Sequence, residues 1–140
     1  MTSSADRWAC DTSVAVASLD PTHQAHGVCR RALVEHRPAL AGHAAFETYS
    51  VLTRLPLPLR LTPAQAAAVL VAAFPDHCWL DAAATRELHG RLAEAGIVGG
   101  SVYDALVGQA ALAYDRVLLT RDVRAERTYR ALRVDYRLVD

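Results

Sequence analysis

Residues 7–19, RWACDTSVAVASL, predict a short strand that passes directly into a helix. The apolar run ends at Cys10, and the three residues that follow, Asp11, Thr12 and Ser13, can all cap a helix. Asp11 is therefore expected at the carboxyl end of a strand. Because ligands of open α/β sheets bind outside the carboxyl ends of the strands, Asp11 is a first candidate for chemistry.

The rest of the chain alternates short apolar or β-branched runs with longer Ala- and Leu-rich segments of helical periodicity. This alternation is typical of βαβ units around a parallel sheet and predicts an α/β fold. Two prolines in residues 55–61 exclude a helix there, whereas Thr62 and Pro63 are the residue types of a helix start. Further strands are expected at residues 38–42, 77–80, 117–120 and 134–138, and helices at 20–36, 44–54, 62–74, 81–95, 102–114 and 123–132.

The composition limits the possible functions. Hydrophobic residues make up 52% of the 140 residues, which suits one domain with its own core. The 15 basic residues balance 15 acidic ones, so no overall positive field draws the protein to nucleic acid. Every basic residue is an arginine. The lack of lysine removes the P-loop lysine, Schiff-base chemistry and the lysine of haloacid-dehalogenase and receiver domains.

Signals for secretion, membranes and disulfides are weak. Residues 1–10 are polar, and the longest apolar run, residues 66–74, has nine residues against the roughly 20 of a membrane span. The cysteines Cys10, Cys29 and Cys78 contain no Cys-x-x-Cys pair, which argues against a disulfide scaffold and a structural zinc site. We expect a cytoplasmic protein without a membrane segment.

Four acids occupy positions that such a fold brings together. Asp122 follows the strand expected at residues 117–120 with one residue between them. Glu47 and Asp104 lie near the starts of apolar helices, where a lone carboxylate needs no other role than to offset the positive helix end, by about 0.3–1 kcal/mol. Strand ends and helix starts of a right-handed parallel fold face the same rim, so we expect convergence of Asp11, Glu47, Asp104 and Asp122.

Carboxylates at close range repel one another unless a cation neutralises them, and Mg²⁺ or Mn²⁺ prefers oxygen ligands. Such a site activates water and stabilises charge on a phosphoryl group, which predicts metal-assisted phosphodiester hydrolysis. Asp11, Asp104 and Asp122 are expected as direct ligands, with Glu47 binding a second ion or orienting the water. Two alternatives stay open. One is a phosphatase with Asp11 as nucleophile, although Ser13 replaces its second acid, and the other is a non-catalytic interaction module whose acids only cap helices.

Several segments together resemble one family. They are CDTSVAVA (10–17), FETYSVLTRLP (46–56), YDAL (103–106), LTRD (119–122) and YRAL (129–132). Their order and spacing resemble the PIN-domain ribonucleases, and specifically the VapC toxins of bacterial type II toxin–antitoxin pairs. Some relatives carry a further acid about three residues beyond the last one, but this chain has Arg124, Ala125 and then Glu126, so Glu126 is left out of the cluster.

The resemblance implies a three-layer α/β/α fold with a central, mostly parallel sheet of four to five strands. It also implies a Mg²⁺- or Mn²⁺-dependent endoribonuclease that inhibits growth or translation. The acidic cluster would be Asp11, Glu47, Asp104 and Asp122. The expected partners are RNA, a VapB-type antitoxin that covers the site and a second copy of the toxin, with no DNA contact by the toxin alone.

Hydroxyls and arginines accompany the acids. Thr12, Ser13 and Thr120 either hold the carboxylates or a metal-bound water, or serve only as caps. Residues 116–140 contain seven arginines against four acids, which a solvated helix face largely explains. The exceptions expected to contact RNA phosphates are Arg121 and Arg124.

Other features point to no additional site. Aromatic residues are too sparsely interleaved to indicate a platform for base stacking. His23 and His26 have helical spacing, but no second pair completes a zinc site. Residues 55–61 and the apolar helix over 64–74 either belong to the core or form a groove for an antitoxin segment.

Overall fold

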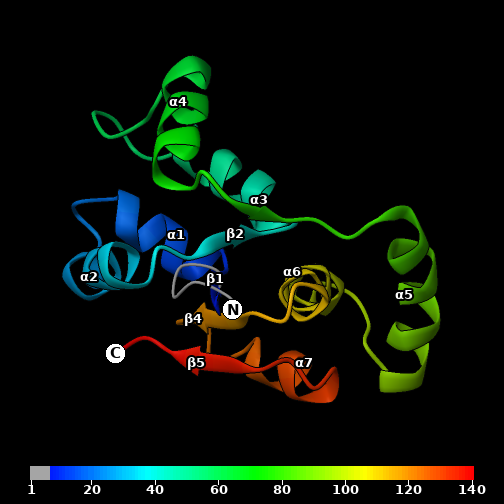
Figure 1. Ribbon diagram of the computed structural model, residues 1–140. Helices are drawn as coiled ribbons and strands as arrows, with labels where there is room; N and C mark the ends of the chain where they lie inside the picture. The colour runs from blue at the N-terminus through cyan, green and yellow to red at the C-terminus, as the bar shows by residue number, and fades with distance from the viewer. Residues whose placement is uncertain (1–6) are drawn as a thin grey trace.

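The computed structural model describes residues 7–140 and has a five-stranded sheet in which every pair of neighbouring strands is parallel (Figure 1). The strand order is β3-β2-β1-β4-β5, which places β1 in the centre. The strands are β1 (Trp8–Cys10), β2 (Ala39–Ala41), β3 (His77–Cys78), β4 (Val117–Thr120) and β5 (Tyr136–Leu138). The expected α/β fold with a parallel sheet is confirmed.

Helices cover both faces of this sheet. They are α1 (Thr12–Leu19), α2 (His26–His36), α3 (Ala44–Leu52), α4 (Pro63–Ala73), α5 (Ala82–Ala95), α6 (Ser101–Ala113) and α7 (Glu126–Ala131). Figure 1 shows α1 and α2 on one side of the strands and α6 and α7 on the other. The chain moves from β1 to β2 and β3 and then returns to β4 beside β1, so right-handed crossovers put the later helices on the opposite face. The result is the expected three-layer arrangement.

Small residues allow the helices to lie close to the strands. Ala9, Ala39 and Ala41 are fully buried in the two neighbouring strands β1 and β2. Gly42 follows β2 with φ of +52°, and a Cβ atom at this position would lie 2.9 Å from the Cβ of Ala110 on α6. Glycine therefore lets α6 approach the carboxyl end of β2 while the backbone turns toward α3.

The second helix begins later than the sequence predicted. It was expected over residues 20–36, but α2 begins at His26. The Asp20 carboxylate accepts hydrogen bonds from the backbone N–H and the hydroxyl of Thr22, at 2.9 and 2.7 Å. These contacts stabilise a separate turn over residues 21–25, because a side chain that bonds the nearby backbone competes with helix formation.

Several other expected elements are shorter in the structure, and the last strand, expected at residues 134–138, begins at Tyr136. The strand expected at residues 77–80 ends at Cys78, which leaves Trp79 outside the sheet. The helix expected at residues 123–132 begins at Glu126, because residues 123–125 form a turn over the Asp122 carboxylate.

Within residues 7–140, no helix is both long enough and apolar enough to cross a membrane. All three cysteines are buried and unpaired.

Candidate active site

Asp11 lies at the carboxyl end of the central strand and begins α1 as its N-cap. Its Oδ1 accepts hydrogen bonds from the Ser13 hydroxyl at 2.5 Å and the Val14 backbone N–H at 3.3 Å. Its Oδ2 accepts one from the Tyr129 hydroxyl at 2.9 Å. With 4% of its surface exposed, the carboxylate is held on both sides by donors.

Asp122 lies at the end of the neighbouring strand. The register pairs Cys10 of β1 with Leu119 of β4, so the residues that follow these two positions come to the same edge of the sheet. The backbone N–H of Asp122 donates to the Thr120 hydroxyl at 3.0 Å. Its carboxylate Oδ1 accepts from the backbone N–H of Arg124, also at 3.0 Å, and thereby shapes the turn before α7.

Glu47 and Asp104 approach the same edge from two helices. Each lies in the first turn of its helix, α3 and α6 respectively. Helix α3 packs against α1, and α6 packs against β2, β3 and β4. One Glu47 carboxylate oxygen lies 3.8 Å from His43 Nε2. The structure therefore brings together the four acids that the sequence singled out, instead of scattering them over different faces.

Burial and the charges of neighbouring acids raise the pKa values of Asp104 and Glu47. Burial and then the charges of Asp122, Glu47 and Asp11 raise the pKa of Asp104 to about 6. Burial also raises the pKa of Glu47, although His43 and the Thr12 hydroxyl act in the opposite direction. A helix N-terminus stabilises a carboxylate, so the raised pKa of Asp104 means that burial and repulsion outweigh the helix dipole.

The Asp11 carboxylate shows the strongest conflict between burial and hydrogen bonding. Burial raises its pKa, while hydrogen bonds from Ser13, Thr120 and Tyr129 lower it. In turn, burial and the adjacent Asp11 raise the pKa of the Tyr129 hydroxyl, which keeps that hydroxyl a neutral donor. The protein thus holds a buried carboxylate next to three others.

The donor set has the charge and chemistry that suit a hard divalent cation. All four groups offer carboxylate oxygens, and a cation between them would relieve the repulsion that raises the Asp104 pKa. Within residues 7–140, however, no three side chains of His, Cys, Asp or Glu are close enough, as placed, to enclose an ion. The individual ligand roles therefore stay a prediction.

The hydroxyls expected to accompany the acids all contact them. The Ser13 hydroxyl donates to Asp11 and accepts from the backbone N–H of Arg121 at 2.8 Å, so it ties α1 to the loop after β4. The Thr12 hydroxyl bonds Glu47, and the Thr120 hydroxyl bonds Asp11. These contacts orient the carboxylates in addition to any capping role.

The two arginines expected at the substrate differ in their surroundings. One guanidinium nitrogen of Arg121 donates to the backbone carbonyl of Val139 at 2.6 Å, which ties it to the C-terminal segment. The side chain of Arg124 is exposed beside the turn that follows β4. Contact with RNA phosphates stays a prediction for both. The exposed side chain of Arg124 is better placed for it than that of Arg121, which already bonds Val139.

Comparison with known proteins decides the family. The PIN domain family model matches residues 9–131, which contain all four acids. The chain belongs to the PIN-domain family.

Curated relatives of this PIN-domain chain carry ribonuclease names. "Ribonuclease VapC27" of Mycobacterium tuberculosis is 47% identical over 126 residues, which cover 90% of this chain and 92% of the relative. "Ribonuclease VapC40" of the same species is 48% identical over 130 residues, which cover 92% of this chain and 96% of the relative. The resemblance to VapC PIN-domain ribonucleases is confirmed, and RNA-cleaving hydrolase is the enzyme class that these relatives support.

Sequence reasoning missed Tyr129 as a residue of this PIN-domain site. Its ring is buried in α7, and its hydroxyl meets an acid 118 positions away in the chain. A Cβ atom at Gly108 would lie 3.0 Å from the Tyr129 ring and 2.9 Å from Val134, so glycine makes this close packing possible. A tyrosine inside a short helix, seven residues before β5, carries no local signal for such a role.

Proposed function

We propose that this PIN-domain protein is a divalent-metal-dependent endoribonuclease and the toxin of a type II toxin–antitoxin pair. The observation that carries the proposal is the convergence of four carboxylates, two after the neighbouring strands β1 and β4 and two in the first turns of α3 and α6. Together with burial, their proximity also raises the pKa of Asp104. Charge repulsion of this kind destabilises the fold, and proteins retain it chiefly at functional sites. The ribonuclease names of the relatives support RNA as the substrate.

In this proposal Asp11, Asp104 and Asp122 hold Mg²⁺ or Mn²⁺, and Glu47 holds a second ion or orients the attacking water. When bound, the metal acidifies water and stabilises the negative charge that grows on the phosphate. Tyr129 and Ser13 fix the Asp11 carboxylate from opposite sides and prevent it from rotating away. Glu47 has a raised pKa and is only half-buried, which suits a carboxylate that accepts a proton from water.

The proposal includes a VapB-type antitoxin, a toxin homodimer, growth inhibition and action in the cytoplasm. Exposed apolar side chains in and near α4 support a protein partner. Leu57 in the connector before α4 and Val71 on α4 are each at least 70% exposed. Burial of such side chains would favour a protein–protein contact.

The experiment is RNA cleavage by the purified protein with Mg²⁺ or Mn²⁺. Asp104→Asn should lower the cleavage rate at least about 100-fold, because it removes one carboxylate at nearly constant shape. Asp115→Asn is the matched control, since Asp115 is exposed at the far end of α6 and asparagine tolerates its φ of +54°. Undiminished cleavage by Asp104→Asn would contradict the proposed site.

The phosphatase alternative has less support. Both carboxylate oxygens of Asp11 accept hydrogen bonds, and the side chain is almost fully buried. A nucleophile needs a free oxygen in line with the phosphorus atom. A stable phosphoenzyme trapped on Asp11 would reverse this preference.

A further inference from the structure

A row of aromatic rings lies beside the acidic site. Each ring is near the next, with centroid separations of 5.7, 5.6, 6.4 and 5.2 Å along the row. The aromatic row consists, in order, of His77, Trp79, Phe46, His43 and Tyr103. Three separate segments contribute to it: β3 with the residue after it, α3 with the residue before it, and α6. Sequence spacing gave no sign of such a platform, because the rings meet only through the fold.

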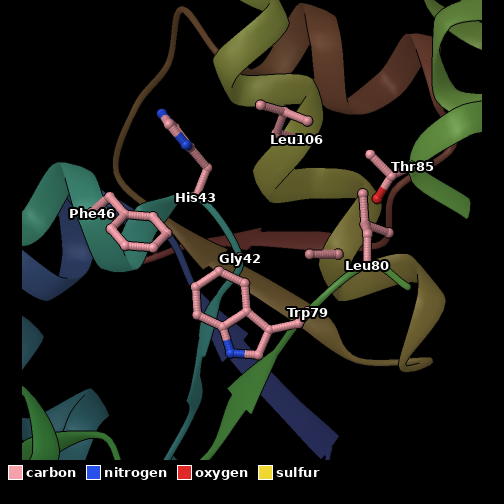
Figure 2. Close-up of a pocket in the computed structure, with 8 residues that line it drawn as sticks. Gly42, His43, Phe46, Trp79, Leu80, Thr85 and Leu106 are labelled. Atoms are coloured by element: carbon pink, nitrogen blue, oxygen red, sulfur yellow. The ribbon is translucent and has the colours of Figure 1, made fainter. Parts of the chain in front are cut away.

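The large rings of this row are open to solvent. Phe46 is 63% exposed, Tyr103 52% and Trp79 44%. Phe46 and Trp79 border a mainly apolar cavity of about 180 Å³, as Figure 2 shows. Exposed aromatic side chains in a contiguous group mark a binding surface more often than isolated ones do.

The row continues into the acidic site. His43 Nε2 lies 3.8 Å from the Glu47 carboxylate, and Tyr103 directly precedes Asp104. A second cavity of about 460 Å³ is lined by Glu47 together with three ring residues of the row, and Arg54 contributes a cation to the same wall. A molecule that reaches from Glu47 along α3 would therefore pass over rings and a guanidinium.

We propose that the aromatic row stacks unpaired bases of single-stranded RNA next to the phosphodiester that is hydrolysed at the acidic site. The inference rests on the proposed nuclease function and assigns the contact with the bases of its substrate to these rings. Every base has an apolar face that fits an exposed ring, and proteins commonly combine such stacking with cations along the backbone. Bases held inside a duplex cannot reach the rings, so the row selects single-stranded segments, loops or bulges.

Trp79 provides a direct test, because the chain has only two tryptophans and Trp8 is buried. In a Trp8→Phe protein, fluorescence reports on Trp79 alone. A 2′-O-methyl RNA octamer, which is not cleaved, is titrated in without divalent metal. Stacking should quench the Trp79 emission, whereas an abasic octamer of equal charge should leave it nearly unchanged. Equal quenching or equal affinity for both oligomers would overturn the proposal.

A second measurement does not depend on this reporter. Anisotropy of a labelled octamer should show that Trp79→Leu weakens binding roughly 5- to 100-fold, the loss of one base–ring stack. Trp79→Phe should retain most of the affinity, because phenylalanine also offers a ring face. Tyr114→Leu is the matched control, since Tyr114 is a similarly exposed ring at the opposite end of α6. Binding unaffected by Trp79→Leu overturns the proposal.

Sedimentation distinguishes RNA from a second copy as the occupant. If Trp79→Leu turns a dimer into a monomer and leaves RNA affinity intact, the row is a contact between copies and the proposal is wrong. A different result would refute the nuclease function and not the base-stacking surface. Wild-type protein that binds the octamer through Trp79 but never cleaves RNA with Mn²⁺ would refute the nuclease and leave the base-stacking surface in place.

Discussion

The acids at the strand ends and the acids on the helices contribute to the site in different ways. Asp11 caps α1, and Asp122 shapes the turn before α7, so each forms hydrogen bonds that the local fold needs. For Asp104, burial and three neighbouring carboxylates all raise the pKa, and together they outweigh the favourable helix N-terminus. Glu47 is intermediate, because His43 and Thr12 partly offset its burial.

This difference distinguishes acids that the fold itself needs from acids that only a function explains. A carboxylate that caps a helix would be retained in a protein without any activity, so its presence alone says little about chemistry. A half-buried carboxylate that repels its neighbours destabilises the metal-free fold and calls for a functional explanation. The helix acids are therefore the more informative targets for mutation.

The largest expected effect separates the two kinds of acid directly. Asp11→Ala and Asp104→Ala should each lower RNA cleavage at least about 100-fold. Only Asp11→Ala should also lower the free energy of unfolding, by roughly 2 kcal/mol, because it removes a helix cap and leaves the buried Tyr129 hydroxyl without its acceptor. Urea unfolding of the metal-free proteins measures this. An equal loss of stability in both variants would contradict the comparison.

Divalent metal should have the next largest effect. If the acids bind an ion, millimolar Mn²⁺ should stabilise the wild-type protein, by about 2.7 kcal/mol when the free ion is at 100 times its Kd. Asp104→Asn should weaken this response, whereas Asp115→Asn should preserve it. Thermal melts with and without Mn²⁺ check both. A wild-type melting temperature that does not respond would favour an interaction module over a nuclease.

The pH dependence of the metal-free protein sharpens the comparison. The pKa of Asp104 is raised from 3.8 to about 6, so folding favours its protonated form. Its contribution to stability is fully present below pH 3.8 and is lost as the pH rises through about 6. Between pH 4 and 7 the wild-type protein should lose roughly 1–2 kcal/mol relative to Asp104→Asn, after allowance for solvent screening. If the free energy of unfolding depends on pH in the same way in both proteins, folding does not raise the pKa of Asp104.

The smallest expected effect concerns a single hydrogen bond at a strand-end acid. Tyr129→Phe keeps the buried ring and removes only the hydroxyl that donates to Asp11. The free energy of unfolding should fall by about 1 kcal/mol. Tyr136→Phe is a matched control, because its hydroxyl bonds Glu126 at 2.9 Å outside the acidic site. If cleavage falls after Tyr129→Phe and not after Tyr136→Phe, Tyr129 positions Asp11 for catalysis.

Prediction from the sequence succeeded where the signal was local. The strand before Asp11, the strand over residues 117–120 and the start of α4 at Thr62 and Pro63 follow from residue types over a few positions. The start of α2 was misplaced, because the Asp20 carboxylate stabilises a turn that helical periodicity does not reveal.

The sequence by itself determined that acids follow the strands and open the helices, because capping chemistry and periodicity act over one or two turns of chain. Only the tertiary structure decided that β4 lies beside β1, that Tyr129 reaches Asp11 and that rings from three segments form one row. These contacts join positions far apart in the chain. They depend on how whole elements pack against one another, and no short stretch of sequence encodes that packing.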